Sequence, residues 1–187
     1  MLEKLKAEVL LAYQELNRYG LDSCAWGAVS AIDRETGRIV MKSAREAIVV
    51  DLQGNVLEGT QTSASDVHSH IALYRAFPQL GGVARPNATC ATIFAQVGMD
   101  IPALGSFHKE RFQGEIPCAV SAAQMGDVFR DRNMDPRQTP AALVLSHSAY
   151  AWGVTALDAV SNAAALEETA NMAYHTMQLD HGLRPMQ

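Results

Sequence analysis

Residues 81–96 read GGVARPNATCATIFAQ, and this stretch decides the fold. A pair of glycines opens it, and residues 83–84 are apolar and suit a short buried strand. Pro86 ends that strand, because its ring fixes φ and removes a backbone hydrogen-bond donor. The stretch therefore predicts a strand followed at once by a turn.

The second half of the same stretch predicts a helix. Asn87 is a suitable N-cap for a helix that continues through residues 94–95 and closes at Gly98. Arg85 and Asn87 then lie at the corner between strand and helix, where α/β sheets usually present their ligand sites. We expect the functional site at this corner.

The composition indicates one compact domain that spans residues 1–187. Hydrophobic residues make up 48% of the chain and charged residues 19%, which argues against disorder. The formal net charge of -5 and the pI near 5.6 give no reason to expect nucleic acid or an acidic membrane surface as a partner. An anionic ligand would have to be held by local donors.

Cysteine usage and hydropathy predict a cytoplasmic location. The three cysteines, Cys24, Cys90 and Cys118, are an odd number without the spacing of a disulfide framework, which suits a reducing compartment. No apolar run approaches the roughly 18 residues that a membrane span requires, and the amphipathic N-terminus lacks the apolar core of a signal peptide.

Apolar periodicity predicts helices between antiparallel strands. Glycine, proline and polar turn residues separate the segments, and residues 131–140 read as a loop. Ser63 or Ser65 is the expected cap of the second helix. The expected helices are 2–18, 66–77, 88–97, 122–130 and 156–179, and the expected strands are 26–32, 38–42, 48–52, 56–57, 83–84, 101–103, 116–118 and 143–146.

The chain resembles the family of L-ribulose-5-phosphate 4-epimerases and class II (zinc) sugar-phosphate aldolases. The family segment Gly-Gly-Ile-Val-His-Thr-His-Ser-x-x-Ala-Thr-x-x-Ala-Gln matches residues 81–96, and its Phe-Ala-Trp-Gly matches residues 150–153, which read YAWG. The resemblance implies an α/β (α+β) fold with a central mixed, mostly antiparallel sheet flanked by helices. It also implies a homo-oligomer, most often a tetramer, that acts on a small molecule.

The resemblance places the family's zinc ligands on residues that do not all bind metal. In the family the two histidines of His-x-His are ligands, and here Arg85 and Asn87 stand at those positions. The third histidine falls on His147, and the neighbouring acid falls on Asp66. Because a guanidinium stays charged and repels a cation, we expect the inherited site to be lost. Zinc or another divalent metal is therefore disfavoured as a cofactor.

A rebuilt metal site is the alternative to loss of the metal. Asp66 and His70 are four residues apart and share a helix face, so they could join His147 around an ion. His68 is two residues from His70 and points to the other side of the helix, which favours a solvent-facing role.

The family's phosphate-binding positions are only partly kept. The motif Thr-Trp-Gly-Asn-Val-Ser becomes residues 25–30, with Ala28 in place of the asparagine. The motif Lys-Pro-Ser-Gly corresponds to residues 42–45, which read KSAR, and Pro-Ser-Ser-Asp corresponds to residues 63–66, which read SASD. The candidate substrate-binding residues that the resemblance implies are Lys42, Ser43, Ser65, Arg85 and Asn87.

Four side chains are candidates for catalysis: Asp66, Arg85, Glu110 and His147. Glu110 matches the family's acid/base in Thr-His-Ala-Asp-Tyr, and a carboxylate there keeps the capacity to move a proton. In one reading these four form a metal-free pocket in which Arg85 holds an anionic oxygen. In the other, Arg85 forms a salt bridge with Asp66 and closes the old site as structure.

These observations lead to one function and two alternatives. We expect a divergent epimerase-like or aldolase-like enzyme that acts on a small carbonyl or hydroxy substrate by proton transfer or C-C bond chemistry. The first alternative is a non-catalytic protein that binds a small ligand or serves as an oligomeric scaffold. The second is retained metal-dependent L-ribulose-5-phosphate 4-epimerase activity.

Overall fold

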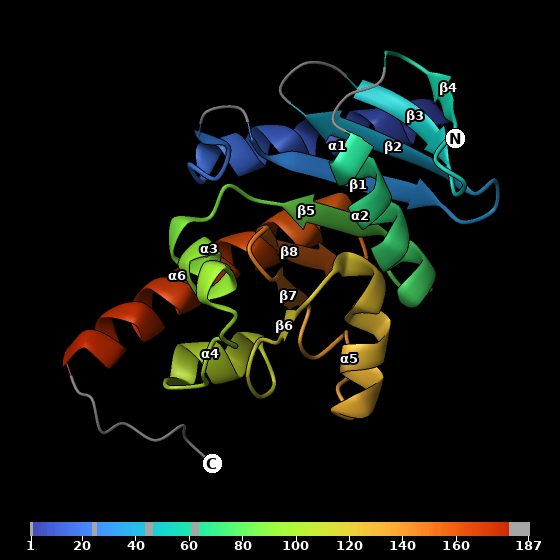
Figure 1. Ribbon diagram of the computed structural model, residues 1–187. Coiled ribbons are helices and arrows are strands. Elements are labelled where there is room, and N and C mark those ends of the chain that lie inside the picture. Colours follow the sequence, from blue (N-terminus) through green and yellow to red (C-terminus); the bar gives the residue numbers. More distant parts are fainter. Residues whose placement is uncertain (1, 24–25, 44–46, 61–63, 180–187) are drawn as a thin grey trace.

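The computed structural model describes residues 2–23, 26–43, 47–60 and 64–179. Within these ranges the strands form one sheet in the order β4-β3-β2-β1-β5-β8-β7-β6 (Figure 1). The strands are β1 (Ala28–Asp33), β2 (Arg38–Ser43), β3 (Ala47–Asp51), β4 (Val56–Glu58), β5 (Gly82–Arg85), β6 (Cys118–Ala119), β7 (Ala141–Val144) and β8 (Ser148–Gly153).

Helices cover both faces of this sheet. In Figure 1, α2 and α5 lie on the near face, and α1 and α6 lie behind the strands. The helices are α1 (Leu2–Arg18), α2 (Ala64–Ala76), α3 (Thr89–Val97), α4 (Ser106–Arg111), α5 (Met125–Asp131) and α6 (Ala156–Leu179), with a short 3₁₀ helix η2 (Ala122–Gln124) before α5.

The pairing of the strands confirms the predicted mixed, mostly antiparallel sheet. Every pair of neighbouring strands is antiparallel except β6 with β7, which is parallel. β5 lies near the middle of the sheet, between β1 and β8. Residues 81–96 therefore contribute a central strand of the sheet.

Two hydrophobic cores lie on opposite faces of the sheet, because successive strand residues point to opposite sides. Along β1, Ala28 and Ile32 pack in the core under α2 and α5, whereas Val29 and Ala31 pack in the core under α1, α3 and α6. Ser30 lies on the α2 side, is fully buried and is hydrogen-bonded there. This polar position under α2 belongs to the candidate site.

The glycine pair that opens the deciding stretch allows a close backbone approach. An added Cβ at Gly81 would lie 1.9 Å from the carbonyl oxygen of Val154, and one at Gly82 would lie 2.5 Å from Cα of Ala156. No side chain fits at such distances. The two glycines therefore let β5 pass directly under the turn between β8 and α6.

The start of α3 differs from the prediction. The helix begins at Thr89, one residue later than an N-cap at Asn87 would place it, and its N-cap residue Ala88 has no capping side chain. The side chain of Asn87 instead donates to the carbonyl of Ser23 at 2.7 Å, so the predicted N-cap was wrong. The predicted end is confirmed, because Gly98 closes the helix with a left-handed φ of 70°.

A carboxylate from another helix supplies the missing cap. The two oxygens of Glu167 in α6 accept hydrogen bonds from the backbone N–H groups of Cys90 and Ala91, at 2.8 and 3.0 Å. A negative charge at this end of a helix is favoured, because the first N–H groups have no partner within the helix. A contact distant in sequence thus replaces the local cap.

Other segments depart from the prediction in smaller ways. Residues 106–111 form α4, which the sequence analysis did not predict because six residues show too little periodicity. The expected helix over residues 122–130 is divided into η2 and α5. Residues 101 and 116 form only an isolated bridge, and β7 ends before residue 146. The expected caps Ser63 and Ser65 fall outside the described side chains.

None of the helices in the described ranges has the length and apolar character needed to cross a membrane. The longest helix, α6, carries charged and polar residues along most of its length.

We expect that replacing Glu167 with Ala destabilises the protein by about 1–2 kcal/mol, because the N–H groups at the start of α3 then lose their acceptor. Urea denaturation followed by circular dichroism measures this difference. Glu168→Ala removes the neighbouring, exposed carboxylate and is the matched control. Equal effects of the two variants would show that Glu167 does not act as a cap.

Candidate functional site

The candidate site lies at the end of β5, under the first turns of α2. The register pairs Arg85 with Ala28 of β1, and its neighbour Ala84 with Ala151 of β8. A methyl group at residue 28 leaves room for the long side chain of Arg85 beside it. Arg85 is only 8% exposed, so its guanidinium is held inside the protein.

Arg85 forms a buried ion pair with Asp66. Nε of Arg85 lies 3.1 Å from Oδ1 of Asp66, and Nη2 donates to Oδ2 at 3.2 Å. Nη2 also donates to the backbone carbonyl of Trp26. Asp66 lies in the first turn of α2, where a helix favours a negative charge, and is 7% exposed. Of the two arrangements expected from the sequence, the structure therefore has the one in which Arg85 forms a salt bridge with Asp66.

A second polar group surrounds His70, one helical turn after Asp66. Nδ1 of His70 lies 2.7 Å from Oγ of Ser30, and that hydroxyl lies 2.9 Å from the hydroxyl of Tyr74. Burial, and to a lesser extent the charge of Arg85, lower the pKa of His70 to about 3. The imidazole is therefore neutral at neutral pH.

Tyr150 links the buried imidazole to an exposed one. Its ring centroid lies 6.0 Å from that of His70 and 6.3 Å from that of His147. Burial raises the pKa of Tyr150, while a hydrogen bond with Ser69 and the charge of Arg85 lower it to a smaller extent. Tyr150 was not among the site residues expected from the sequence. The available signal was a tyrosine where the family motif has phenylalanine.

Three buried polar atoms around the ion pair have no hydrogen-bond partner among the described residues. They are Nε of Arg85, Nε2 of His70 and the hydroxyl of Tyr150. Nε of Arg85 lies 3.1 Å from Oδ1 of Asp66, so the ion pair compensates it, and Ser69 lies close enough to the Tyr150 hydroxyl to lower its pKa. An unsatisfied buried polar group is costly, at about 1–3 kcal/mol. Two of the three atoms belong to the rings of His70 and Tyr150, whose centroids are 6.0 Å apart.

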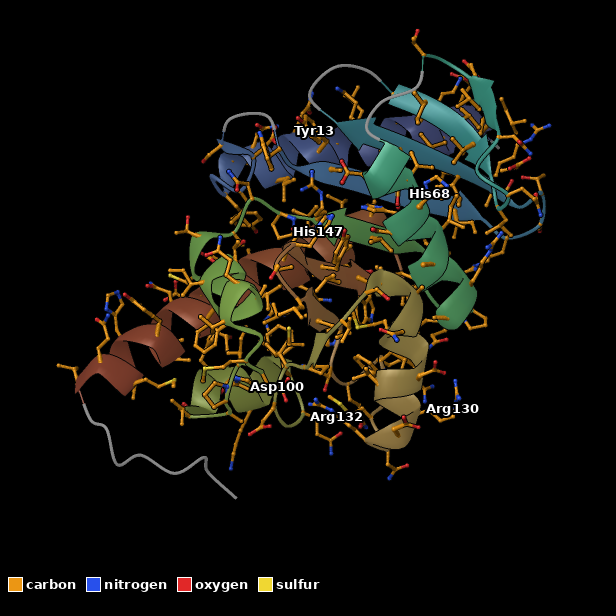
Figure 2. The ribbon with its side chains drawn as sticks, viewed as in Figure 1. Tyr13, His68, Asp100, Arg130, Arg132 and His147 are labelled. Atoms are coloured by element: carbon orange, nitrogen blue, oxygen red, sulfur yellow. The ribbon has the colours of Figure 1, made fainter. Side chains whose placement is uncertain are left out.

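The other predicted site residues are distributed around this cluster. His147 is exposed on the turn between β7 and β8, and Figure 2 shows it near the middle of the molecule, whereas His68 lies on α2. The predicted exposure of His68 is confirmed. Asn87 bonds the Ser23 carbonyl and does not point into the cluster. The ammonium of Lys42 lies 4.7 Å from the ring centroid of Tyr13.

Glu110 lies on α4, which packs against α6. It is exposed, and among the described residues no hydrogen bond or ion pair joins it to Arg85 or Asp66. The side chains of Ser43 and Ser65, both predicted to bind substrate, lie outside the described part of the chain. The structure thus brings together Asp66, Arg85 and His70 and leaves Glu110 apart.

The residues present do not fit a catalytic zinc ion. Such an ion needs three ligands with free lone pairs, and here Asp66 is already paired with Arg85. Across the described ranges, no group of three or more His, Cys, Asp or Glu side chains converges in the way metal ligands do. The positive charge of Arg85, which already lowers the pKa of His70, would also repel a divalent cation.

Comparisons with known proteins agree with this fold. The sequence profile described as "Class II Aldolase and Adducin N-terminal domain" matches residues 7–174. The chain is 41% identical over 206 aligned residues to L-ribulose-5-phosphate 4-epimerase UlaF of Salmonella paratyphi A and equally to that of Salmonella typhi, covering 99% of this chain and 90% of each relative.

Solved structures show the same architecture at low sequence identity. An L-fuculose 1-phosphate aldolase superposes with a TM-score of 0.79 at 18% identity, covering 98% of this chain and 89% of that one. L-fuculose-1-phosphate aldolase from Thermus thermophilus gives 0.74 at 17% identity, covering 98% of this chain and all of that one. These likenesses support the fold alone.

We expect Arg85→Met to destabilise the protein by about 3–5 kcal/mol, because the carboxylate of Asp66 is then buried without a counter-charge. The double variant Asp66→Asn/Arg85→Met removes that charge and recovers much of the loss, which urea denaturation measures. Arg130→Met is the control, since Arg130 pairs with Asp127 at the surface, where a pair contributes about 0–1 kcal/mol. A single Arg85 variant as stable as the control would contradict the buried pair.

We also expect acid to destabilise the protein through His70. The unfolded chain binds a proton at this imidazole near pH 6.5, whereas the folded chain does so only near pH 3. His70 therefore does not lower the free energy of unfolding above about pH 6.5. As the pH falls from there towards 3, the free energy of unfolding decreases by up to about 1.4 kcal/mol per pH unit. Urea denaturation between about pH 5 and 7 measures the slope.

His70→Asn should flatten this slope, because an amide that keeps the bond to Ser30 does not titrate. His68→Asn, on the exposed side of the same helix, should leave it unchanged. If the wild type and the His70 variant lose stability equally on acidification, His70 is not the group that titrates.

Proposed function

Because the chain belongs to the family described as class II aldolase and adducin N-terminal domain, we propose that it is an enzyme that transfers protons without zinc. Its substrate is a small carbonyl or hydroxy compound. The observation that carries the proposal is the buried group of Arg85, His70 and Tyr150, in which Nε2 of His70 has no hydrogen-bond partner among the described residues. Groups of this kind cluster at catalytic sites, where the substrate supplies the missing partner.

In this proposal the positive charge of Arg85 stabilises the negative charge that develops on the substrate oxygen, a role that a metal ion would otherwise have. Asp66 and the Trp26 carbonyl hold the guanidinium in a fixed orientation. A fixed donor that is already oriented stabilises a developing negative charge without reorganising during the reaction. The hydroxyl of Tyr150 is the second donor, because its raised pKa keeps it protonated.

The chemical step is a proton transfer next to a carbonyl group. A base removes the proton from the carbon beside the carbonyl, the electron pair of the C–H bond forms the C=C bond of an enolate, and the π pair of the carbonyl moves onto its oxygen. Return of a proton to that carbon restores the carbonyl and can invert the centre. Electrons balance without an oxidant or a reductant. We assign the base to His147, which is exposed beside Tyr150.

The substrate class follows from the relatives. L-ribulose 5-phosphate, which appears in the name of the Salmonella relatives, is the first compound to test because the identity to them extends over 99% of this chain. Lys42 is the candidate for an anionic substituent, although the asparagine of the family's phosphate motif is replaced by Ala28. Other sugar phosphates and small hydroxy acids complete the panel.

A non-catalytic oligomeric scaffold is the second candidate function. The observation in its favour is the same ion pair, since a guanidinium that is 8% exposed and bonded to Asp66 has little capacity left for a substrate. A homotetramer remains the predicted assembly in either case. Glu110, apart from the cluster within one chain, would then have its role at a contact between subunits.

We expect the protein to catalyse exchange of a substrate C–H proton with D₂O in the presence of EDTA, because the proposed chemistry needs no metal. NMR spectroscopy of the panel compounds measures the exchange. Arg85→Met should slow it by about 10²–10³-fold, the usual loss when one donor to an oxyanion is removed. Arg130→Met removes an exposed arginine and serves as the control.

Two outcomes would contradict this proposal in different ways. Exchange that EDTA abolishes and zinc restores would show that a metal site was rebuilt. A complete absence of exchange over the whole panel, from protein that is folded by circular dichroism, would favour the scaffold.

A further inference from the structure

A pocket of about 370 Å³ lies beside the start of α6, away from the ion-pair cluster. Gly153, the last residue of β8, lines it and pairs with Gly82 at the start of β5, whereas Arg85 is the last residue of β5. The pocket and the ion-pair cluster therefore lie at opposite ends of the same strand. The volume of the pocket is within the range of small-ligand sites.

Two arginine side chains contribute positive charge to this pocket. Arg111, at the end of α4, and Arg137, in the loop before β7, line it, and both are exposed, so a ligand can reach them. Within the described ranges Arg111 forms no ion pair, and its Nη2 donates to Oγ of Ser161 at 3.4 Å. Arg137 pairs with Asp135 through Nε and Nη2, which leaves Nη1. Since a guanidinium has five N–H donors, both residues retain donors for an anionic group.

The first two turns of α6 form another wall, which carries hydrogen-bond acceptors. Asp158, Ser161 and Asn162 line the pocket, and their spacing of three and four residues places them on one face of the helix. Oδ2 of Asp158 accepts from the N–H and the hydroxyl of Thr155, at 3.0 and 2.8 Å, whereas Oδ1 has no hydrogen-bond partner in the described part of the chain. Asn162 donates through Nδ2 to the carbonyl of Trp152 at 2.9 Å, and its amide oxygen remains as an acceptor.

The charges around the pocket balance but are separated. Arg111 and Arg137 are positive, Asp158 is negative, and Asp135 adds a second negative charge beside Arg137. Among the described residues no ion pair joins Arg111 to Asp158. A simple anion would be repelled by Asp158 and a simple cation by Arg111, whereas a ligand that carries one charge of each sign is attracted at both ends.

We propose that this pocket binds an α-amino acid as its zwitterion. The carboxylate accepts from Arg111 and Arg137, and the ammonium donates to Oδ1 of Asp158. Ser161 contacts Arg111 and lies three residues after Asp158, so the two charged walls are about one helical turn apart. The carboxylate and the ammonium on one α-carbon can span that separation through their hydrogen bonds.

Apolar residues of the same pocket offer contacts to the side chain of the amino acid. Leu80, Pro136 and Val154 line it together with the charged groups. A few oriented polar groups combined with apolar walls are the usual character of a small-ligand site. An amino acid with an aliphatic side chain is therefore the first probe to test.

The experiment titrates L-leucine into the ¹⁵N-labelled full-length protein. We expect saturable changes in the NMR signals of the backbone amides of Gly153 and Val154, which lie at the pocket. Two matched compounds each lack one charge: 4-methylpentanoate has no ammonium, and 3-methylbutylamine has no carboxylate. Each should bind about tenfold more weakly than L-leucine, the low end of the effect of a hydrogen bond to a charged group. No turnover is measured, so the result is independent of the proposed proton transfer.

Two variants connect each charge of the ligand to one wall. Arg111→Met should weaken L-leucine binding about tenfold and remove its advantage over 3-methylbutylamine. Asp158→Asn keeps an oxygen that accepts from Thr155 and should remove the advantage of L-leucine over 4-methylpentanoate. Such matched losses identify the group on the protein that contacts each group on the ligand.

Asp127→Asn and Arg130→Met are the matched controls. Asp127 also lies in the first turn of a helix, α5, and pairs with Arg130 at the surface. Neither residue lines the pocket, so both variants should keep all three affinities within about twofold of the wild type.

Three results would overturn the proposal. Amide signals that do not saturate with L-leucine would mean that the pocket holds solvent only. Equal affinities of the wild type for L-leucine and either matched compound would mean that the site does not recognise a zwitterion. Wild-type affinities in both the Arg111 and the Asp158 variant, each folded by circular dichroism, would place the binding elsewhere.

Discussion

A guanidinium and a carboxylate buried against each other determine the character of this protein's central site. Arg85 and Asp66 come from β5 and α2, so their pairing joins the sheet to the helix that covers it. Taking both groups out of water is costly, and the cost is offset only while both remain in place. The pair therefore holds α2 against β5 and also places a charged guanidinium among the neighbouring polar groups.

The effects of this pair extend to the groups around it. The charge of Arg85 adds to burial in keeping His70 neutral, and it acts on the hydroxyl of Tyr150. The same charge opposes a divalent cation, whereas it would attract an anionic oxygen. The proposed metal-free chemistry depends on this preference for an anion over a cation.

The fold was predictable because its helices and strands follow from the spacing of apolar residues in short stretches of the sequence. Helical periodicity predicted α1 and α6 at their observed bounds or close to them, and alternation predicted the antiparallel strands around β5. The family membership is confirmed by the profile match and by the identity to the Salmonella proteins. Deviations occurred where contacts distant in sequence decide, as for Asn87, which is drawn to the Ser23 carbonyl.

The site was only partly predictable for the same reason. Sequence spacing placed Asp66 and His70 on one helix face, and the salt bridge between Arg85 and Asp66 was one of two readings that the residues allowed. Which reading holds depends on the packing of α2 against β5, which no local pattern records. Tyr150 was missed although it stands where the family motif has phenylalanine, because its contact with the His70 ring depends on packing. The roles assigned to Glu110 and His147 stay predictions.

The cap that Glu167 provides to α3 has a consequence for synthesis on the ribosome. The carboxylate lies 76 residues beyond the amide of Ala91 that it accepts from, and β8, which flanks β5, is also made late. The strand and the following helix cannot form all of their contacts until the first half of α6 has emerged, because Glu167 lies in the middle of this 24-residue helix. Domains generally fold as units during translation, and this corner must be among the last parts to become rigid.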